Sequence, residues 1–529
     1  MRKKSKTIRI YKRAGLKISI AHNIRKHIKK TKNKFIGILD IKIFKTSIMF
    51  CFFLRIPSKF KIYKILRKYD IIITNPKSLN FVVTHYEQIL QWLNSKEFKE
   101  QYINTNHPYP PLLNPRRLKD LKYRTKENQE SQNIQPYTNL SYQTISAELA
   151  WDLNLPLPKY YQFLFWGGHG SGSSGLTTFL EYCGMIQCPW KGVYSGNGKE
   201  SYLWYFSNLT QNHSKAYYLT IREFVKSATK FFALVSHSKA LLIVRDPISN
   251  LKSFVQLAIP KEGWCTRASN PITITLQSNP NEVCQNLVGY WSMDSKSNLH
   301  IGDVPSFETI SYFIDTEQYA GAFHDTQLKN ALINLKDSVI IDMSEIVGEK
   351  TFDTMTRLSK ELGFQAPKEE ERGSLATQRA IEYLNFLPIT LQVEISKRKI
   401  HIIIQDNAFK TDYLNITSLL FNQKCFYNRI IVCINKDNWE TLKQDSKTLQ
   451  EIKDYLLKFI PRLQQQKEIE DKKKITESQV LEYFKEHKDL RMQFKQVLDE
   501  HLAYIKSVRP DIVQSWKYYQ EFERICGRG

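Results

Sequence analysis

The sequence predicts an α/β protein with a parallel β-sheet flanked by helices. Patterns typical of buried strands and of helices alternate between residues 155 and 365, and such alternation is characteristic of parallel sheets. An apolar run at 163–166 leads into a glycine-rich stretch and then into a helix-like pattern. A second apolar run, 240–244, ends in Arg245-Asp246-Pro247. The length of 529 residues is enough for several domains around a well-buried core.

The positive charge of the chain is concentrated at its N-terminus. Residues 1–70 hold 22 Lys and Arg against two Asp, whereas the remaining chain holds 55 basic and 50 acidic residues. The body is therefore nearly neutral, and a nucleic-acid partner is not expected. The apolar block 48–54 is shorter than the ~20 residues that span a bilayer. We expect residues 1–70 to form a basic amphipathic arm on an anionic membrane surface; the alternative is a Lys-rich helical extension.

The cysteines predict neither disulfides nor a metal centre. The eight cysteines are scattered, without a CxxC pair and without a histidine at zinc-ligand spacing. Free thiols indicate a reducing compartment. We therefore expect a cytoplasmic protein, peripheral on the inner membrane face if the arm binds lipid, with no metal ion.

The expected parts of the chain follow from shifts in composition. After the arm, residues 71–150 comprise a strand-and-helix unit at 71–95 and a polar linker at 102–142. Residues 151–370 form the α/β core. Residues 371–529 form a C-terminal extension, in which the β-branched runs 399–406 and 428–436 are expected to pair as strands. From 439 to 524 the pattern is mostly helical, with interruptions at Pro461 and Pro510.

The stretch from Phe163 to Leu180 has the order strand, glycine loop, helix N-terminus. This order holds phosphate, because glycines let backbone N–H groups approach an anion at the positive end of the helix dipole. Gly170 and Gly175 have the spacing of a Walker-type loop, with Thr177 at the Ser/Thr position and Leu176 in place of the lysine. The predicted anion-binding residues are Gly170, Ser171, Gly172, Ser173, Ser174, Gly175, Thr177 and Thr178.

Two further motifs follow. Pro247 stops the strand 240–244 and suits the first turn of a helix, so that Ser253 could face the same anion as Arg245. Residues 338–364 show a buried strand, an acidic turn and an amphipathic helix that Gly363 ends.

Together, in this order, the three motifs resemble the PAPS-dependent sulfotransferase family. The resemblance covers about residues 160–365. It implies a P-loop-type sheet, with the loop around Ser173, Gly175 and Thr177 on the 5′-phosphosulfate of PAPS. It also implies that Arg245 and Ser253 bind the 3′-phosphate, and that 339–364 completes the core. Where the family has a loop lysine, this chain has Ser173; His169, Lys199 and Lys252 are candidates to replace its charge.

In that family a His or Glu between the two phosphate motifs takes the proton of the acceptor hydroxyl. Glu200, His213 and Glu223 are the candidates here, with His169 as a further catalytic candidate beside the loop. The expected reaction is sulfuryl transfer from PAPS to a hydroxyl, for example on a surface glycan or lipid-linked sugar. The alternatives are a P-loop kinase or NTPase, with Asp342 as a candidate strand-end acid, and a non-catalytic nucleotide- or glycan-binding protein on the same fold.

The segment 255–300 stands between the second and third motifs. It contains Trp264 and Trp291 among polar residues. This composition suits a sugar-binding face and equally suits a loop packed on the sheet.

Overall fold

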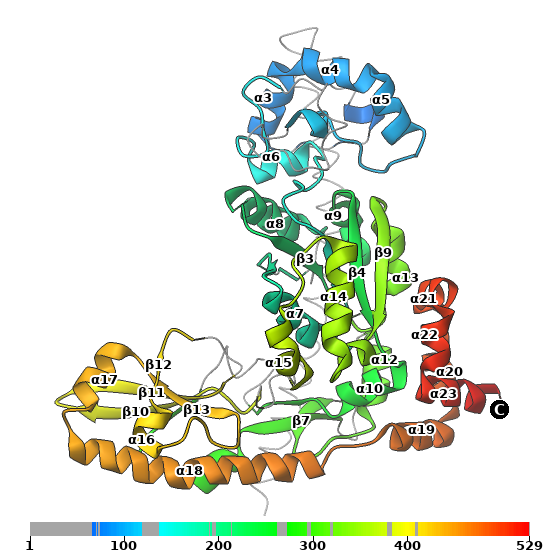
Figure 1. Cartoon of the computed structure of the whole chain (residues 1–529). Coiled ribbons are helices and arrows are strands. Elements are labelled where there is room, and N and C mark those ends of the chain that lie inside the picture. The colour runs from blue at the N-terminus through cyan, green and yellow to red at the C-terminus, as the bar shows by residue number, and fades with distance from the viewer. Residues whose placement is uncertain are drawn as a thin grey trace, which may run out of the picture. The chain divides into compact units, whose positions relative to one another are not determined.

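A computed structural model shows the fold of the protein (Figure 1). It describes residues 66–69, 71, 73, 75–118, 137–189, 191–192, 197–212, 214–261, 272–293, 298–317, 321–377, 383, 385–407 and 411–527. The chain divides into two compact units, Met1–Ser141 with Glu148–Leu155 and Tyr142–Ala147 with Pro156–Gly529. The domain boundaries expected near residues 150 and 370 remain predictions. The predicted amphipathic arm, apart from 66–69, lies outside the described residues.

The first unit is helical where the sequence predicts a strand followed by a helix. Residues 71, 73 and 75 are not in a strand, and a helix begins directly after Asn75. Asn75 accepts a hydrogen bond from the N–H of Lys77 and Pro76 occupies the first helical position, so local capping starts a helix here. The elements of this region are α3 (Pro76–Thr84), α4 (Tyr86–Asn94), α5 (Lys96–Phe98), η1 (Lys99–Ile103), η2 (Pro115–Leu118) and α6 (Ala147–Asp152).

Part of the predicted linker belongs to the core of this unit. Leu112 and Leu118 are fully buried, and the N–H of Leu112 donates to the carbonyl of Leu153. The indole of Trp92 donates to the carbonyl of Pro111 at 3.0 Å. The mainly polar segment 102–142 therefore contains a short apolar stretch that packs in the core of this unit and does not act as a linker.

The second unit contains the predicted parallel sheet. Its strands run in the order β2 (Ile186–Gln187), β3 (Tyr217–Ile221), β1 (Leu164–Gly167), β4 (Ser238–Val244) and β9 (Leu335–Asp342). Every neighbouring pair is parallel, which confirms the α/β class. The chain places β3 on one side of β1 and β4 on the other, so the end of β1 is a switch point, where open α/β sheets bind ligands.

Helices cover the sheet, as Figure 1 shows for α7 (Ser173–Tyr182) and α14 (Lys350–Leu362). Phe165 of β1 shares one buried cluster with Leu176 of α7 and with Met355 of α14. The neighbouring Trp166 points to the other face, because side chains alternate along a strand, and its ring stacks on Tyr504. As predicted, the apolar face of α14 is buried and Gly363 ends the helix with φ +80°.

The predicted pairing of the two β-branched runs is confirmed. β11 (Arg398–Asp406) pairs antiparallel with β13 (Ile430–Ile434) in a sheet ordered β12 (Leu414–Asn415), β13, β11, β10 (Ile389–Ile395) and β6 (Ile272–Ile274). Thus β6, from the 255–300 segment, joins this sheet. The same segment contributes β5 (Ala258–Pro260) and β7 (Val288–Met293), which form a three-stranded sheet with β8 (Leu299–Gly302).

The long helix α18 (Ser446–Lys472) runs alongside the sheet that contains β10 to β13 (Figure 1). Its side chains Ile452, Leu456 and Phe459 join the buried cluster of that sheet. The interruption predicted at Pro461 is wrong, because the helix continues through it. Pro461 is exposed, so packing on the opposite side of the helix holds it together despite the missing N–H. Pro510 is the first residue of α22, as a helix start permits.

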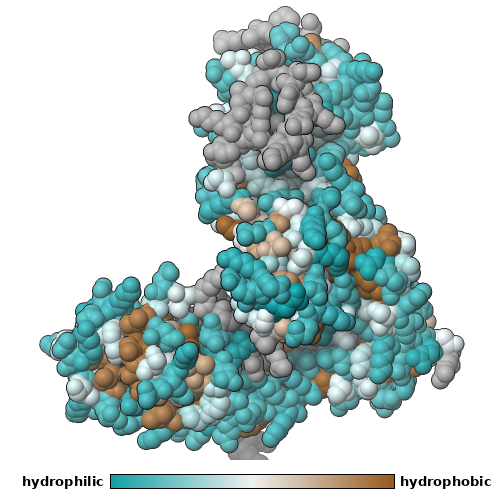
Figure 2. Space-filling model, in the orientation of Figure 1, coloured by the Kyte–Doolittle hydropathy of each residue, from teal (hydrophilic) through white to brown (hydrophobic). Residues whose placement is uncertain are grey.

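The C-terminal region is helical, as predicted, with α19 (Glu477–Glu486), α20 (Lys488–His501), α21 (Ala503–Val508), α22 (Pro510–Ser515) and α23 (Lys517–Gly527). In the part of the chain that the structure describes, the remaining α-helices are α8 (Lys199–Gln211), α9 (Thr229–Ala233), α10 (Pro247–Val255), α11 (Pro280–Gln285), α12 (Thr309–Asp315), α13 (Asp325–Ala331), α15 (Arg372–Thr377), α16 (Thr417–Phe421) and α17 (Lys436–Leu442). Also present are the short 3-10 helices η4 (Lys226–Ala228), η6 (Met343–Ile346) and η7 (Glu369–Glu371). Among the described residues, no helix combines the length and the apolar character that crossing a bilayer requires. The surface in view is mainly hydrophilic, with apolar side chains gathered near the sheet of β10 to β13 (Figure 2).

Candidate functional site

The glycine loop lies at the carboxyl end of β1. Gly170 and Gly172 adopt φ +78° and +94°, which only glycine adopts without strain, and Gly172 is the capping residue of α7. The loop also lies close to neighbouring backbone, since a β-carbon on Gly168 would collide with the carbonyl oxygen of Ala322. The predicted order of strand, tight glycine loop and helix N-terminus is therefore present.

The start of α7 presents backbone donors. No residue that the structure describes accepts a hydrogen bond from the N–H of Ser173, Ser174 or Gly175. These N–H groups are the first orphan donors of the helix, and they carry the positive end of its dipole. The first turn of α7 can therefore bind an anion.

The predicted hydroxyl groups of the loop divide into two sets. Those of Thr177 and Thr178 donate to the carbonyls of Ser173 and Ser174, at 2.9 and 3.2 Å, and Ser171 donates to the carbonyl of Gly168 at 2.7 Å. These three hydroxyls therefore stabilise the loop and helix in this structure. Ser173 and Ser174 remain as the hydroxyls that begin the helix; Ser173 is buried and Ser174 is exposed.

Arg245 joins the two predicted phosphate motifs. It follows β4, the neighbour of β1, and its Nη1 donates to the carbonyl of Gly170 at 2.9 Å and to Oγ of Ser253 at 3.0 Å. Ser253 in turn donates to the carbonyl of Ser249, one turn earlier in α10. Burial lowers the pKa of Arg245, while the carboxylate of Glu477 acts in the opposite sense. The glycine loop, Arg245 and Ser253 thus form one hydrogen-bonded unit.

The two acids at neighbouring strand ends are engaged in structural hydrogen bonds. Asp246 accepts from the N–H groups of Ile248 and Ser249 through one oxygen and from those of Tyr518 and Tyr519 through the other. Burial raises the pKa of Asp246, and these N–H groups offset part of that effect. Asp342 likewise accepts hydrogen bonds from the backbone N–H of Ser344 and from Nε1 of Trp516. Both carboxylates therefore have a structural role, because they join segments that pack around the strand ends.

A histidine and a glutamate face each other beside the loop. Nε2 of His169 lies 3.4 Å from Oε1 of Glu223, which follows β3. The imidazole is 57% exposed and the glutamate only 13%, and the backbone N–H of His169 donates to the carbonyl of Gly321. This pair places an accessible imidazole beside a mostly buried carboxylate, next to the candidate anion site.

Of the other predicted catalytic and cationic residues, those that the structure describes form no hydrogen bond or ion pair with the loop. Glu200 is exposed and, among the described residues, makes no hydrogen bond or ion pair. The capping residue of its helix, Gly198, packs against Phe231 of α9, which leads to the starting end of β4. Lys252 forms an ion pair with Glu477 of α19, in which Nζ lies 2.8 Å from Oε1. His213 lies outside the described residues, as does Trp264.

Asn250 is a site residue that the sequence prediction omits. Its side chain is 4% exposed and lies directly against Gly170, so that a β-carbon on the glycine would collide with Oδ1. The sequence carried one signal for this residue. Asn250 precedes Ser253 by three residues, and residues three apart in a helix lie on the same face.

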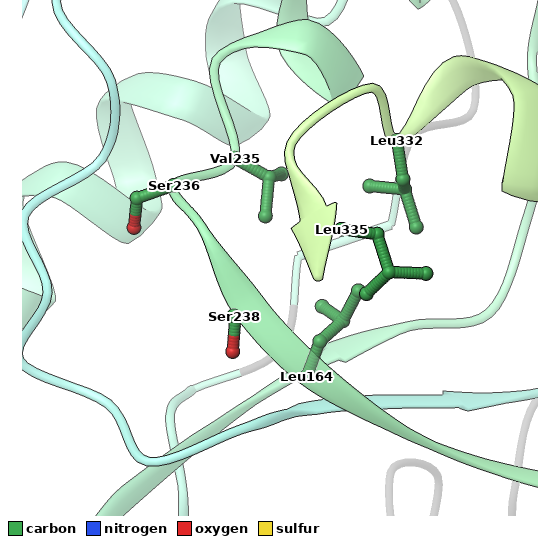
Figure 3. A pocket seen from close by; sticks show the side chains of 6 residues that line it. All are labelled: Leu164, Val235, Ser236, Ser238, Leu332 and Leu335. Carbon is green, nitrogen blue, oxygen red and sulfur yellow. The ribbon is translucent and has the colours of Figure 1, made fainter. Parts of the chain in front are cut away.

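A small depression lies at the opposite edge of the sheet (Figure 3). It is lined by Leu164, Val235, Ser236, Ser238, Leu332 and Leu335. These residues lie at or just before the starts of β1, β4 and β9, away from the loop. Within the described ranges, no group of three His, Cys, Asp or Glu side chains is placed to hold a metal ion.

Asp325 is a buried acid near the loop. Burial raises its pKa from 3.8 to about 7, with partial compensation by the indole of Trp166. Between about pH 4 and pH 7 the carboxyl of Asp325 is protonated in the folded protein but ionised in the unfolded chain. The free energy of unfolding therefore falls as the pH rises from about 4 to 7. Asp325→Asn is expected to remove that loss and to raise stability at pH 8 relative to wild type, by at most about 4 kcal/mol.

Urea unfolding of both proteins from pH 4 to pH 8 measures this difference. All other titrating groups are shared, so the difference between the two curves isolates Asp325. Parallel curves would show that Asp325 keeps its ordinary pKa in the folded protein.

Comparison with known proteins finds a match to a family over part of the chain. A family described as a protein of unknown function (DUF2972) matches residues 340–528. The matched segment begins within β9 and includes Asp342, Glu477, Trp516 and the two tyrosines, Tyr518 and Tyr519, whose N–H groups donate to Asp246. It does not include the glycine loop, Arg245 or Ser253. No curated protein and no solved structure matches the chain.

Proposed function

We propose that this protein binds PAPS at the glycine loop and transfers its sulfuryl group to a hydroxyl acceptor, with a carbohydrate as the expected acceptor. One observation carries the proposal: Nη1 of Arg245 contacts both Gly170 O and Ser253 Oγ. Residues assigned from the sequence to the two phosphate ends of one cofactor are therefore neighbours. The proposed fold type is that of the P-loop sulfotransferases.

The residues present suit such a cofactor. The open N–H groups at the start of α7 suit its 5′-phosphosulfate, since a helix N-terminus binds anions without needing a lysine. Arg245 and Ser253 suit the 3′-phosphate, because a guanidinium recognises phosphate through directed, charge-assisted hydrogen bonds. PAPS supplies the sulfuryl group, while the chain supplies the orientation and the charge stabilisation.

His169 is the proposed general base. Glu223 beside Nε2 favours the tautomer that carries its proton there, which leaves Nδ1 to accept a proton. The acceptor hydroxyl gives this proton to Nδ1 as its oxygen forms the new bond to sulfur and the bond from sulfur to the departing phosphate oxygen breaks. Glu223 then stabilises the imidazolium that forms.

The acids at the strand ends weigh against a kinase or NTPase. Such an enzyme uses a loop lysine and a strand-end acid that holds magnesium. Leu176 replaces the lysine, and the carboxylates of Asp246 and Asp342 already accept hydrogen bonds through both oxygens. Asp246 accepts four hydrogen bonds and can bind a metal ion only by losing some of them, while Asp342 already joins Ser344 and Trp516.

Calorimetry with 3′-phosphoadenosine 5′-phosphate tests the cofactor assignment. We expect Arg245→Ala to weaken binding by about 10- to 100-fold, because it removes a charge-assisted hydrogen bond donor from the 3′-phosphate. Adenosine 5′-monophosphate, which lacks that phosphate, should bind weakly and to the same extent in both proteins. Arg357→Ala is the matched control, since Arg357 is an exposed arginine of α14 paired with Glu345 and Glu361.

Undetectable binding by wild type, or equal binding by wild type and Arg245→Ala, would overturn the assignment. Transfer of labelled sulfate from PAPS to a glycan extract then separates an enzyme from a non-catalytic binding protein. His169→Ala should abolish transfer while leaving nucleotide binding unchanged.

A further inference from the structure

The side chain of Asn250 is buried without a partner. It is 4% exposed, and no residue that the structure describes forms a hydrogen bond with its carboxamide. The N–H of its backbone is used within α10, where it donates to Asp246 O. The carboxamide therefore has hydrogen-bonding capacity that no described residue uses, and a ligand bound at the loop can use it.

The carboxamide faces the glycine loop. Oδ1 lies against the α-carbon of Gly170, in the space that a larger residue at 170 would occupy. Rotation of the amide by half a turn places Nδ2 there instead, since the two ends have the same size. Its donor would then lie beside the loop that precedes the open N–H groups of Ser173 and Ser174.

The charges around the loop explain why a neutral donor matters. Lys252, on the same helix, is paired with Glu477 at 2.8 Å, and Arg245 is the cation that contacts the loop. A sulfuryl group carries a single negative charge, so a neutral amide donor adds a hydrogen bond to it without a compensating cation.

We propose that Nδ2 of Asn250 donates a hydrogen bond to a sulfuryl oxygen of PAPS and so replaces the absent lysine as a neutral positioning group. This inference rests on the proposed function, because it needs PAPS in the loop. It goes further by assigning the sulfuryl end of the cofactor to a residue outside the three motifs. It also predicts that the site distinguishes PAPS from the same nucleotide without the sulfuryl group.

Calorimetry with PAPS and with 3′-phosphoadenosine 5′-phosphate tests this assignment in the full chain. We expect Asn250→Ala to weaken PAPS binding by about tenfold or more and to change binding of the desulfated nucleotide less than about twofold. Asn250→Asp, which keeps the shape and adds a negative charge, should weaken PAPS binding further. Ser249→Ala is the control on the same helix, since its side chain bonds Glu477 rather than the loop.

The outcomes separate the two proposals. If wild type binds neither nucleotide, the proposed function fails and this inference fails with it. If wild type binds both and Asn250→Ala binds PAPS equally well, or loses both nucleotides equally, only the role of Asn250 is overturned. Thermal unfolding of each variant checks that the loss of binding occurs in a folded protein, and Asn250→Asp provides an isosteric variant should alanine destabilise α10.

Discussion

Asp246→Ala is expected to destabilise the C-terminal helices and α10 by about 3 kcal/mol. The carboxylate caps α10 through the N–H groups of Ile248 and Ser249, and it caps α23 through those of Tyr518 and Tyr519. Removing one capping side chain costs about 0.5–2 kcal/mol, and this change removes two caps at once. Because Asp246 is only 9% exposed, water cannot replace the lost acceptors easily.

Hydrogen exchange measured by mass spectrometry resolves this effect along the chain. We expect faster exchange in α10 and α23, with β10 and β11 unchanged, because the latter lie in a different buried cluster. Asp246→Asn is the matched variant: it keeps one acceptor oxygen and directs an amide N–H₂ at the other helix, so an intermediate loss is expected. Unchanged protection of α23 in Asp246→Ala would show that the shared cap does not hold the two helices together.

Gly168→Ala is expected to abolish nucleotide binding and to lower the free energy of unfolding by about 2 kcal/mol. The new β-carbon would collide with the carbonyl oxygen of Ala322, a backbone atom that cannot turn aside as a side chain can. Overpacking of this kind typically costs about 1–3 kcal/mol. The loop or the segment around Ala322 must move, and either shift also disturbs the bond from His169 N to Gly321 O.

Gly373→Ala is the control for this change. Gly373 lies in α15, and a β-carbon there would meet nothing within 4 Å. Alanine is favoured over glycine in a helix, so this variant should be neutral or slightly more stable than wild type. Calorimetry and urea unfolding measure both variants. Nucleotide binding retained by Gly168→Ala would mean that the loop tolerates displacement and does not define the site.

Local patterns predicted the elements around the site correctly. The apolar run before Gly168, the glycines themselves and the helix after Gly172 are each encoded by neighbouring residues, as are the Pro247 helix start and the Gly363 helix end. The pairing of 399–406 with 428–436 was also predictable, because β-branched runs favour strands. These successes share one cause: propensity and capping act within a few residues along the chain.

The errors arose where a local signal competed with packing or with another local signal. Residues 71–75 look strand-like, but Asn75 and Pro76 together start a helix. Pro461 normally ends a helix, yet the buried face of α18 holds it continuous. The strand β6 is short and belongs to a sheet whose other strands lie more than 100 residues later, so no neighbouring residue indicates its partner.

The sequence by itself determined the α/β class, the glycine loop, the placement of Arg245 at a strand end with Ser253 in the following helix, and the absence of a loop lysine. These features depend on residue order and composition. The tertiary structure decided which side chains meet at the site: Arg245 with Gly170, Asn250 with the same glycine, Lys252 with Glu477, and Asp246 with the start of α23. Apart from the loop contacts, these partners lie more than 200 residues apart, and burial between packed elements, which no local pattern records, selects them.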